Sequence, residues 1–269
     1  MKHIAITLLA LLGCSTLASA QVDAETPDQE FEATADIDII SHYVWRGTDM
    51  GAASIQPTGT ISWRGASLSL SGSTGLHRDD DQEIDVTLGY QAGPFNIGLT
   101  DYWQTGCDFD GRDLYFSYDQ EHGAHQLECN IGYTCQYFSL QAYTMIWGND
   151  FKYQTYEDAL ARENGKRAFS TYIELHVPFY MCGLDWDLRG GITPFESANT
   201  IVKTGETDGK PHYRKDHFYA NGATCVLASV RATKNFEIGD VKTPAFLEFV
   251  ANPYLRKAYF LVGVNIKPF

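Results

Sequence analysis

Polar and apolar residues alternate one by one along most of this chain from residue 32 onwards. In segment 83–90, the apolar Ile84 and Val86 lie at even positions, and the charged Glu83 and Asp85 lie at odd positions. This period of two is typical of a β-strand with one polar and one apolar face. The alternation therefore predicts an all-β chain and excludes a helical bundle.

Twelve segments show this pattern, and they are 9 to 15 residues long. They cover 32–46, 54–63, 66–76, 83–91, 95–104, 123–134, 137–148, 167–178, 182–195, 217–231, 243–251 and 257–269. Strands of soluble proteins have a usual length of about 5 or 6 residues, whereas tilted membrane-spanning strands need about 9 to 11. The lengths predict a closed antiparallel transmembrane β-barrel of about 12 strands, since an open sheet edge is excluded from hydrocarbon.

The connections between these segments alternate in length. Every second connection is short, at 64–65, 92–94, 135–136 and 179–181, while three of the others have 18 residues or more, at 105–122, 149–166 and 196–216. Short turns on one rim and long loops on the other are typical of outer-membrane barrels. We expect short periplasmic turns and long outer loops, with connection 232–242 as an exception that is too long for a tight turn.

The first twenty residues have the pattern of an export signal. Lys2 precedes an apolar run, and Ala18-Ser19-Ala20 forms a small-residue cleavage site. We expect a signal peptide at 1–20, a short periplasmic segment at 21–31 and the barrel at 32–269. The alternative is a lipoprotein with Cys14 as the lipidation site. Either way the chain is exported, and the predicted location is the cell outer membrane.

The composition limits which classes of molecule this chain can bind. The net charge of −14 argues against nucleic acid, which needs a basic surface. No uncharged apolar run after residue 20 approaches the roughly 18 to 20 residues of a membrane helix. The five cysteines beyond the signal have no metal-ligand spacing. We expect membrane lipid and small solutes as partners, and no cofactor.

Aromatic residues gather towards the ends of the predicted strands, as an interfacial girdle requires. They are Tyr43, Trp45, Trp63, Tyr90, Phe95, Trp103, Tyr133, Phe138, Trp147, Phe179 and Phe195. The last segment also alternates and finishes at Phe269. It resembles the C-terminal strand by which outer-membrane barrels are recognised, so we expect the insertion machinery as a partner.

A family resemblance rests on the first predicted strand pair. Segment 41–47, Ser-His-Tyr-Val-Trp-Arg-Gly, followed by Ile-Gln-Pro at 55–57, resembles the opening of the TorF-type porins. Segments 144–150 and 170–175 are also similar to recurrent pieces of these uncharacterised outer-membrane barrels. The resemblance implies an outer-membrane location and a transport role, and it implies no catalytic or ligand residue.

The alternation also assigns an inner face to each strand, where charged side chains avoid lipid. The predicted pore-lining residues are Asp36, Asp38, Arg46, Glu83, Asp85, Glu128, Glu174, His176, Asp185, Asp187, Arg189 and Glu248, with Arg231, Lys267 and His42 on the same face. Acids outnumber bases, and an acidic lining attracts cations. We expect a narrow, cation-preferring or neutral-solute channel. The alternative is that these charges pair across the lumen of a closed barrel.

Other candidate chemistry is sparser. Asp108, Asp110 and Asp113 in a predicted outer loop have a spacing reminiscent of calcium sites, but the twelve-residue pattern is absent. Segment 156–164, followed by Gly165, predicts a short helix that folds over the pore mouth.

Two further functions remain open from the sequence. A barrel-wall hydrolase would need a nucleophile beside a base, and only Asp216-His217 offers half of an acid–base pair. A structural or adhesive barrel would present loops 149–166 and 196–216. We expect no enzyme activity.

Overall fold

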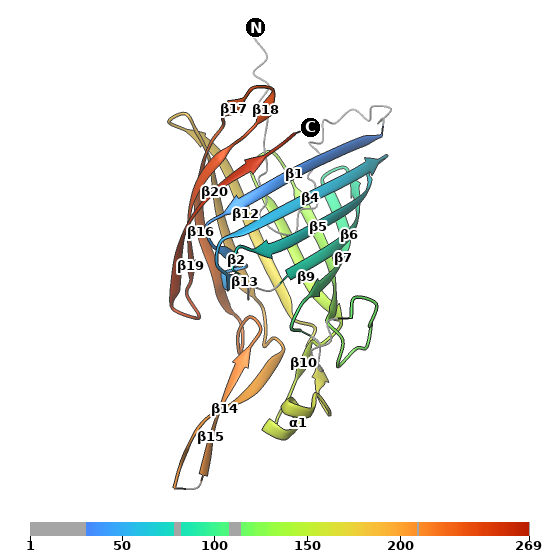
Figure 1. Cartoon of the computed structure of the whole chain (residues 1–269), viewed down its shortest axis with the longest axis vertical. Coiled ribbons are helices and arrows are strands. Elements are labelled where there is room, and N and C mark those ends of the chain that lie inside the picture. Colours follow the sequence, from blue (N-terminus) through green and yellow to red (C-terminus); the bar gives the residue numbers. More distant parts are fainter. Residues whose placement is uncertain (1–30, 78–81, 108–113, 209, 269) are drawn as a thin grey trace.

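The structure, a computed structural model, describes residues 31–77, 82–107, 114–208 and 210–268. Twelve strands close into one antiparallel barrel, as predicted (Figure 1). In chain order they are β1 (Glu32–Ile40), β4 (Ser54–Trp63), β5 (Ala66–Gly75), β6 (Gln82–Ala92), β7 (Phe95–Gln104), β8 (His125–Thr134), β9 (Ser139–Trp147), β12 (Thr171–Met181), β13 (Leu184–Thr193), β16 (Thr224–Lys234), β19 (Ala245–Asn252) and β20 (Lys257–Ile266).

The first and last strands close the barrel. Each barrel strand pairs with its neighbour in sequence, and β1 pairs with both β4 and β20. Ile37, for example, lies opposite Pro57 on one side and Ile266 on the other. β1 pairs with β20 over Ile37–Ile40 and with β4 over its whole length, so the sheet closes on itself.

Four smaller hairpins extend the connections. They are β2 (Tyr43–Trp45) with β3 (Thr48–Gly51), β10 (Phe151–Lys152) with β11 (Lys166–Arg167), β14 (Asn199–Thr207) with β15 (Lys210–His217), and β17 (Glu237–Ile238) with β18 (Val241–Lys242). Figure 1 shows β14–β15 and β10 projecting from one end of the barrel, and β17–β18 at the opposite end. The long loops and short turns therefore lie on opposite rims, as the connection lengths predict.

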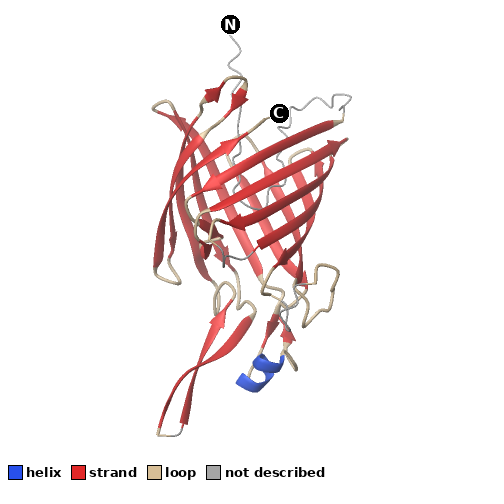
Figure 2. Ribbon diagram, viewed as in Figure 1, coloured by secondary structure: helices blue, strands red, loops and turns tan. Residues whose placement is uncertain are grey.

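One helix, α1 (Tyr156–Ala161), lies between β10 and β11, and the rest of the described fold is strand and loop (Figure 2). The sequence predicts a helix here, but it ends earlier than expected. Arg162, in a left-handed conformation with φ of 52°, ends the helix, so Gly165 has no such role. Among the described residues, no helix has the length and hydropathy that crossing a membrane requires.

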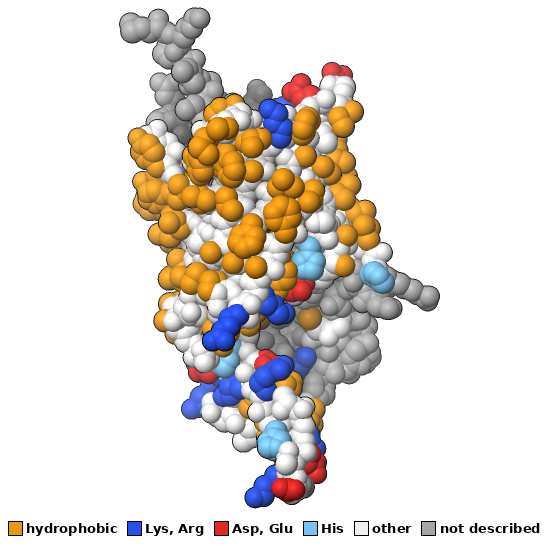
Figure 3. Space-filling view, turned by 90° about the vertical axis from the view of Figure 1, so that its left-hand side faces the viewer, with side chains coloured by type: hydrophobic (Ala, Val, Ile, Leu, Met, Phe, Trp, Pro, Cys, Tyr) orange, Lys and Arg blue, Asp and Glu red, His pale blue; other side chains and the backbone are white. Residues whose placement is uncertain are grey.

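Outward and inward residues separate as the alternation predicts. On β6, Leu88 is 55% exposed and the adjacent Thr87 is 7% exposed. Figure 3 shows hydrophobic side chains over the barrel wall and charged ones mainly towards the two ends. The barrel is thus apolar outside and polar within.

Most strand bounds differ from the predicted ones by a few residues, and two predicted strands differ by more. The first, expected over 32–46, ends at Ile40, and the chain then turns back as the hairpin β2–β3. The tenth, expected over 217–231, is β16 and begins only at Thr224, because β14 and β15 occupy the preceding residues. The long connection 232–242 forms β17–β18, which resolves the exception in the turn lengths.

The aromatic prediction also needs a correction. Trp63, Tyr90, Phe95 and Phe179 are exposed on the outer wall. Tyr43 and Trp45 instead belong to the buried cluster of the β2–β3 hairpin. Trp103 is also buried, because Tyr115 from the following loop packs on it with ring centroids 5.4 Å apart.

Candidate functional site: the barrel lumen

Part of the inner wall, on β4 and β5, is uncharged and hydroxyl-rich. Serines at alternate positions of β5 lie opposite threonines on β4, and opposite Thr87, Asp85 and Glu83 on β6. Thr60 and Ser69 share a hydrogen bond of 2.8 Å, and Gln56 Nε2 donates to Ser73 Oγ at 3.3 Å. On β4 and β5, neighbouring strands thus satisfy each other's polar groups without formal charge.

The other side of the wall, formed by β12, β13, β16 and β19, carries a network of charges. Arg231 Nε donates to Glu248 at 2.8 Å, and Arg189 pairs with the other oxygen of the same carboxylate. Arg189 also lies 3.8 Å from Asp187. The predicted inward charges of these strands therefore lie together and largely pair with one another.

His176 extends this network along β12. Its Nε2 pairs with Glu174, and its Nδ1 lies 3.4 Å from Asp187. Tyr172 donates its hydroxyl hydrogen to Glu174. A histidine between two carboxylates stabilises both, as the alternative of paired lumen charges anticipates.

Four predicted lining acids form no ion pair with a described Lys or Arg side chain: Asp36, Asp38, Glu83 and Asp85. Neutral groups bind them instead. Tyr43 donates to Glu83 at 2.8 Å, and Asn265 Nδ2 donates to Asp38 at 2.9 Å. These carboxylates are the excess negative charge of the described inner wall.

Two other lining predictions fall near the rims of the barrel. Asp185 accepts a hydrogen bond from Asn235 Nδ2 at 2.7 Å at the rim of the short turns. His42 lies on the β1–β2 connection, 3.0 Å from Asp49. Neither belongs to the charge network of β12, β13, β16 and β19.

The β2–β3 hairpin crosses the lumen. Tyr43 contacts Glu83 on β6, while Gly47 packs so closely on β16 that an added Cβ would overlap the Val226 carbonyl oxygen. β6 and β16 are six strands apart in a barrel of twelve, so they lie on opposite walls. A hairpin that touches both walls constricts the lumen at this level.

Arg46 fixes the hairpin in place. Its guanidinium donates to both carboxylate oxygens of Glu128 on β8, at 2.6 and 2.7 Å, and to the Tyr219 hydroxyl at 2.5 Å. The planes of Tyr143 and Tyr172 flank it, with ring centroids 4.2 and 4.8 Å from Cζ. The side chains of Arg46 and Glu128 are 5% and 2% exposed. A buried pair of this kind is stable only with such bidentate geometry and complete hydrogen bonding.

Arg46 was expected on a barrel strand, and its position corrects that expectation. It lies in the turn between β2 and β3, in a left-handed conformation with φ of 48°. The inward orientation results from the hairpin fold and not from strand alternation. Tyr172 has the parity of the inward Glu174 on β12, and Tyr143 has the parity of the buried Gln141 on β9, so alternation indicates both, whereas no sequence signal indicates Tyr219.

The candidate calcium loop and the candidate acid–base pair do not form a site among the described residues. Asp108, Asp110 and Asp113 lie outside the described residues, and within the described part no group of three or more His, Cys, Asp or Glu could hold a metal ion. Asp216 pairs with Arg214 at 2.6 Å and His217 lies 3.2 Å from Glu196, both on the projecting hairpin. Residues 1–30 and Phe269 also lie outside the described residues. They include the predicted signal peptide at 1–20 and all of the predicted periplasmic segment 21–31 except Phe31.

Comparisons with known proteins give structural neighbours only. No family model matches the chain and no curated protein matches it, so the TorF-type assignment stays a prediction. A bacterial polysaccharide outer-membrane secretin is 8% identical, with a TM-score of 0.38 over 87% of this chain and 97% of that one. OprB of Pseudomonas putida is 8% identical, with a TM-score of 0.35 over 88% of this chain and 93% of that one. An outer-membrane channel of Pseudomonas putida F1 is 10% identical, with a TM-score of 0.38 over 87% of this chain and 94% of that one. The function proposed below rests on the geometry of this chain.

Proposed function

We propose that this protein is a porin-like channel of the outer membrane through which small solutes pass passively. The observation that carries the proposal is a closed barrel with an apolar outer surface and a polar, charged inner wall. An apolar outer surface and a polar interior suit a barrel in lipid, because the closed sheet pairs backbone groups between strands and the charged side chains avoid the hydrocarbon.

The outer surface supports a membrane location. Leu70, Leu88 and Ile97 are each more than half exposed on the wall. Trp63, Tyr90 and Phe95 lie at the strand ends on the rim of the short turns, where aromatic rings suit a lipid headgroup region. The proposal includes membrane lipid as partner, TorF-type membership and recognition of the segment ending at Phe269 by the insertion machinery.

The β2–β3 hairpin supports a narrow passage. A barrel of eight strands is filled by side chains, and one of sixteen or more leaves an open channel. This barrel has twelve strands, and a hairpin bridges two opposite walls. We infer that solutes pass beside the hairpin and that it sets the limiting size.

The excess acids support a preference for cations or neutral solutes. Asp36, Asp38, Glu83 and Asp85 form no ion pair within 4 Å with a described Lys or Arg side chain. In a narrow low-dielectric passage, fixed negative charge raises the local concentration of cations. Asp185 adds negative charge on β13, at the rim of the short turns, where a neutral amide binds it.

Conductance in planar bilayers, with the reversal potential under a salt gradient, tests the proposal. We expect discrete current steps with cation preference, and a weaker preference after D85N, D185N and D187N are combined. D240N, which removes an exposed carboxylate from the β17–β18 turn, is the matched control. Anion preference would contradict the charge assignment. No conductance from protein shown to be folded by heat-shifted gel mobility would contradict the channel.

A second candidate is a structural or adhesive barrel, favoured by the β14–β15 hairpin that projects far from the rim (Figure 1). Its residues 203–207 and 210–214 are exposed. If this hairpin is the functional part, its removal abolishes surface attachment in cells. Neither the full chain nor the variant then shows conductance in bilayers.

A further inference from the structure

Two carboxyl groups of one strand, Glu83 and Asp85 on β6, lie side by side on the inner wall. Their alternate positions place both on the same face, and each is within hydrogen-bond reach of the other. Two ionised carboxylates this close repel each other, so either one of them holds a proton or both share a cation. The pair is therefore a place where positive charge is bound.

Asp85 has a carboxylate oxygen that no described donor reaches. The residue is 8% exposed, and Ser71 Oγ donates to its Oδ2 at 3.4 Å, whereas its Oδ1 is buried and accepts no hydrogen bond. Burial of such an oxygen is unfavourable unless a donor or a cation compensates it. Oδ1 is thus available as a ligand atom beside Glu83.

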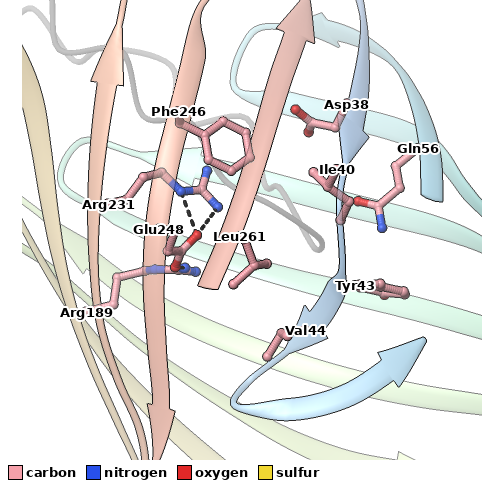
Figure 4. A pocket seen from close by; sticks show the side chains of 10 residues that line it. All are labelled: Asp38, Ile40, Tyr43, Val44, Gln56, Arg189, Arg231, Phe246, Glu248 and Leu261. Atoms are coloured by element: carbon pink, nitrogen blue, oxygen red, sulfur yellow. Dashed lines mark hydrogen bonds and ion pairs between the residues drawn. The ribbon is translucent and has the colours of Figure 1, made fainter. Parts of the chain in front are cut away.

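The arginines of the inner wall do not balance this pair. No described Lys or Arg side chain forms an ion pair within 4 Å with Glu83 or Asp85. Tyr43 Oη donates to Glu83 at 2.8 Å, and Figure 4 shows Tyr43 across the view from the two arginines that pair with Glu248. The pair therefore lies on the acidic side of the hairpin.

Its position makes the pair accessible to ions in the lumen. The contact with Tyr43 places it where the β2–β3 hairpin meets the β6 wall. Glu83, the second residue of β6, is nearer to the rim of the long loops and is only partly buried, whereas Asp85 is buried. A cation that passes beside the hairpin from this rim reaches Glu83 first and then Asp85.

The ligand atoms favour a hard divalent cation. They are oxygens, from the two carboxylates and the Ser71 hydroxyl, and a charge of 2+ compensates both carboxylates. Calcium accepts six to eight oxygens in a flexible geometry that water can complete, whereas magnesium demands a near-ideal octahedron. Two carboxylates are few for a calcium site, so we expect a dissociation constant of about 1 mM.

We propose that Glu83 and Asp85 form a low-affinity calcium site at the constriction of the lumen. The inference deepens the proposed channel function, on which it rests, by adding regulation by a divalent cation. Bound calcium occupies the passage beside the hairpin and neutralises the negative charge that attracts other cations. Calcium therefore reduces the potassium current.

The test measures calcium itself on the refolded full chain. Equilibrium dialysis with radioactive calcium in non-ionic detergent measures binding, and block of the potassium current in planar bilayers measures the effect on passage. Both use 1 M KCl, where the Debye length of about 3 Å screens distant charges. We expect saturable binding at about 1 mM, weakened at least about tenfold by E83Q and by D85N, each of which removes one charged ligand. D240N, with the same charge change outside the barrel, should bind as the full chain does.

A further variant separates this site from the loop acids. D108N, D110N and D113N combined remove the acids of the candidate calcium loop and should leave binding unchanged. No saturable binding by the full chain, a result that needs no variant to fold, would mean that the carboxyl pair holds only a proton and would overturn the site. Binding that both E83Q and D85N leave intact would also overturn it. Binding that depends on both acids, without any conductance, would support the site and overturn the channel, whereas conductance without binding would overturn the site alone.

Discussion

Two hairpins on the same rim of the barrel take opposite courses. β2–β3 folds into the lumen and is held by Arg46, whereas β14–β15 projects away from the wall. The first carries aromatic and apolar side chains, Tyr43, Val44 and Trp45, which join the buried cluster. The second has mainly charged and polar residues, and its ion pair of Arg214 with Asp216 is exposed. The apolar hairpin therefore packs inside the lumen, and the polar hairpin projects into solvent.

The two hairpins also differ in what holds them. Contacts with three separate barrel strands fix β2–β3: Glu83 on β6, Glu128 on β8 and Val226 on β16. The contacts of β14–β15 are mainly with itself, through its own ladder. We expect changes in the first hairpin to affect the whole barrel and changes in the second to have local effects.

Replacement of Arg46 has the largest expected effect. R46A leaves Glu128 buried without its cation, which costs about 3–5 kcal/mol of unfolding free energy. R214A, which removes the exposed pair on β14–β15, should leave the unfolding free energy unchanged within error. Urea unfolding of the refolded barrel measures both, and equal effects would contradict the difference between the hairpins.

Alanine at Gly47 comes next. A Cβ here would overlap the Val226 carbonyl oxygen, and the residue has φ of 81°, which favours glycine. G47A should cost about 3 kcal/mol. G205A on β14, where no atom lies within 4 Å of the added Cβ, should change stability by about 0.5 kcal/mol or less. A mild G47A variant would mean that the hairpin does not pack on β16.

The sequence predicts the barrel better than the lumen, for a physical reason. Alternation reports local geometry along each strand, so the strands and the inward parity of Glu128 and Arg189 follow from it. The course of a loop depends on contacts far along the chain, such as Arg46 with Tyr219, which are 173 residues apart. The extended pattern of 41–46 therefore predicts a longer first strand, although these residues turn inward.

The smallest expected effect concerns another projecting loop. The Thr155 hydroxyl and then the Asn164 amide bind the Asp158 carboxylate and lower its pKa. Because the folded pKa is below the unfolded value, the contribution to α1 is present above about pH 4 and is lost as the pH falls through the folded pKa.

Amide chemical shifts of 156–161, recorded between about pH 5 and pH 2, measure this change. D158N should remove the pH dependence of α1 and leave conductance unchanged. A matching change in the hairpin β2–β3 over the same range would contradict a purely local effect.

Single-channel conductance of two loop variants tests the central claim most directly. In one, a short Gly-Ser linker replaces residues 43–51, and in the other a similar linker replaces 199–217. If β2–β3 is the constriction, the first variant conducts several-fold more than the full chain and the second conducts as the full chain does. Unchanged conductance in the first variant, with its barrel folded by gel mobility, would contradict the account.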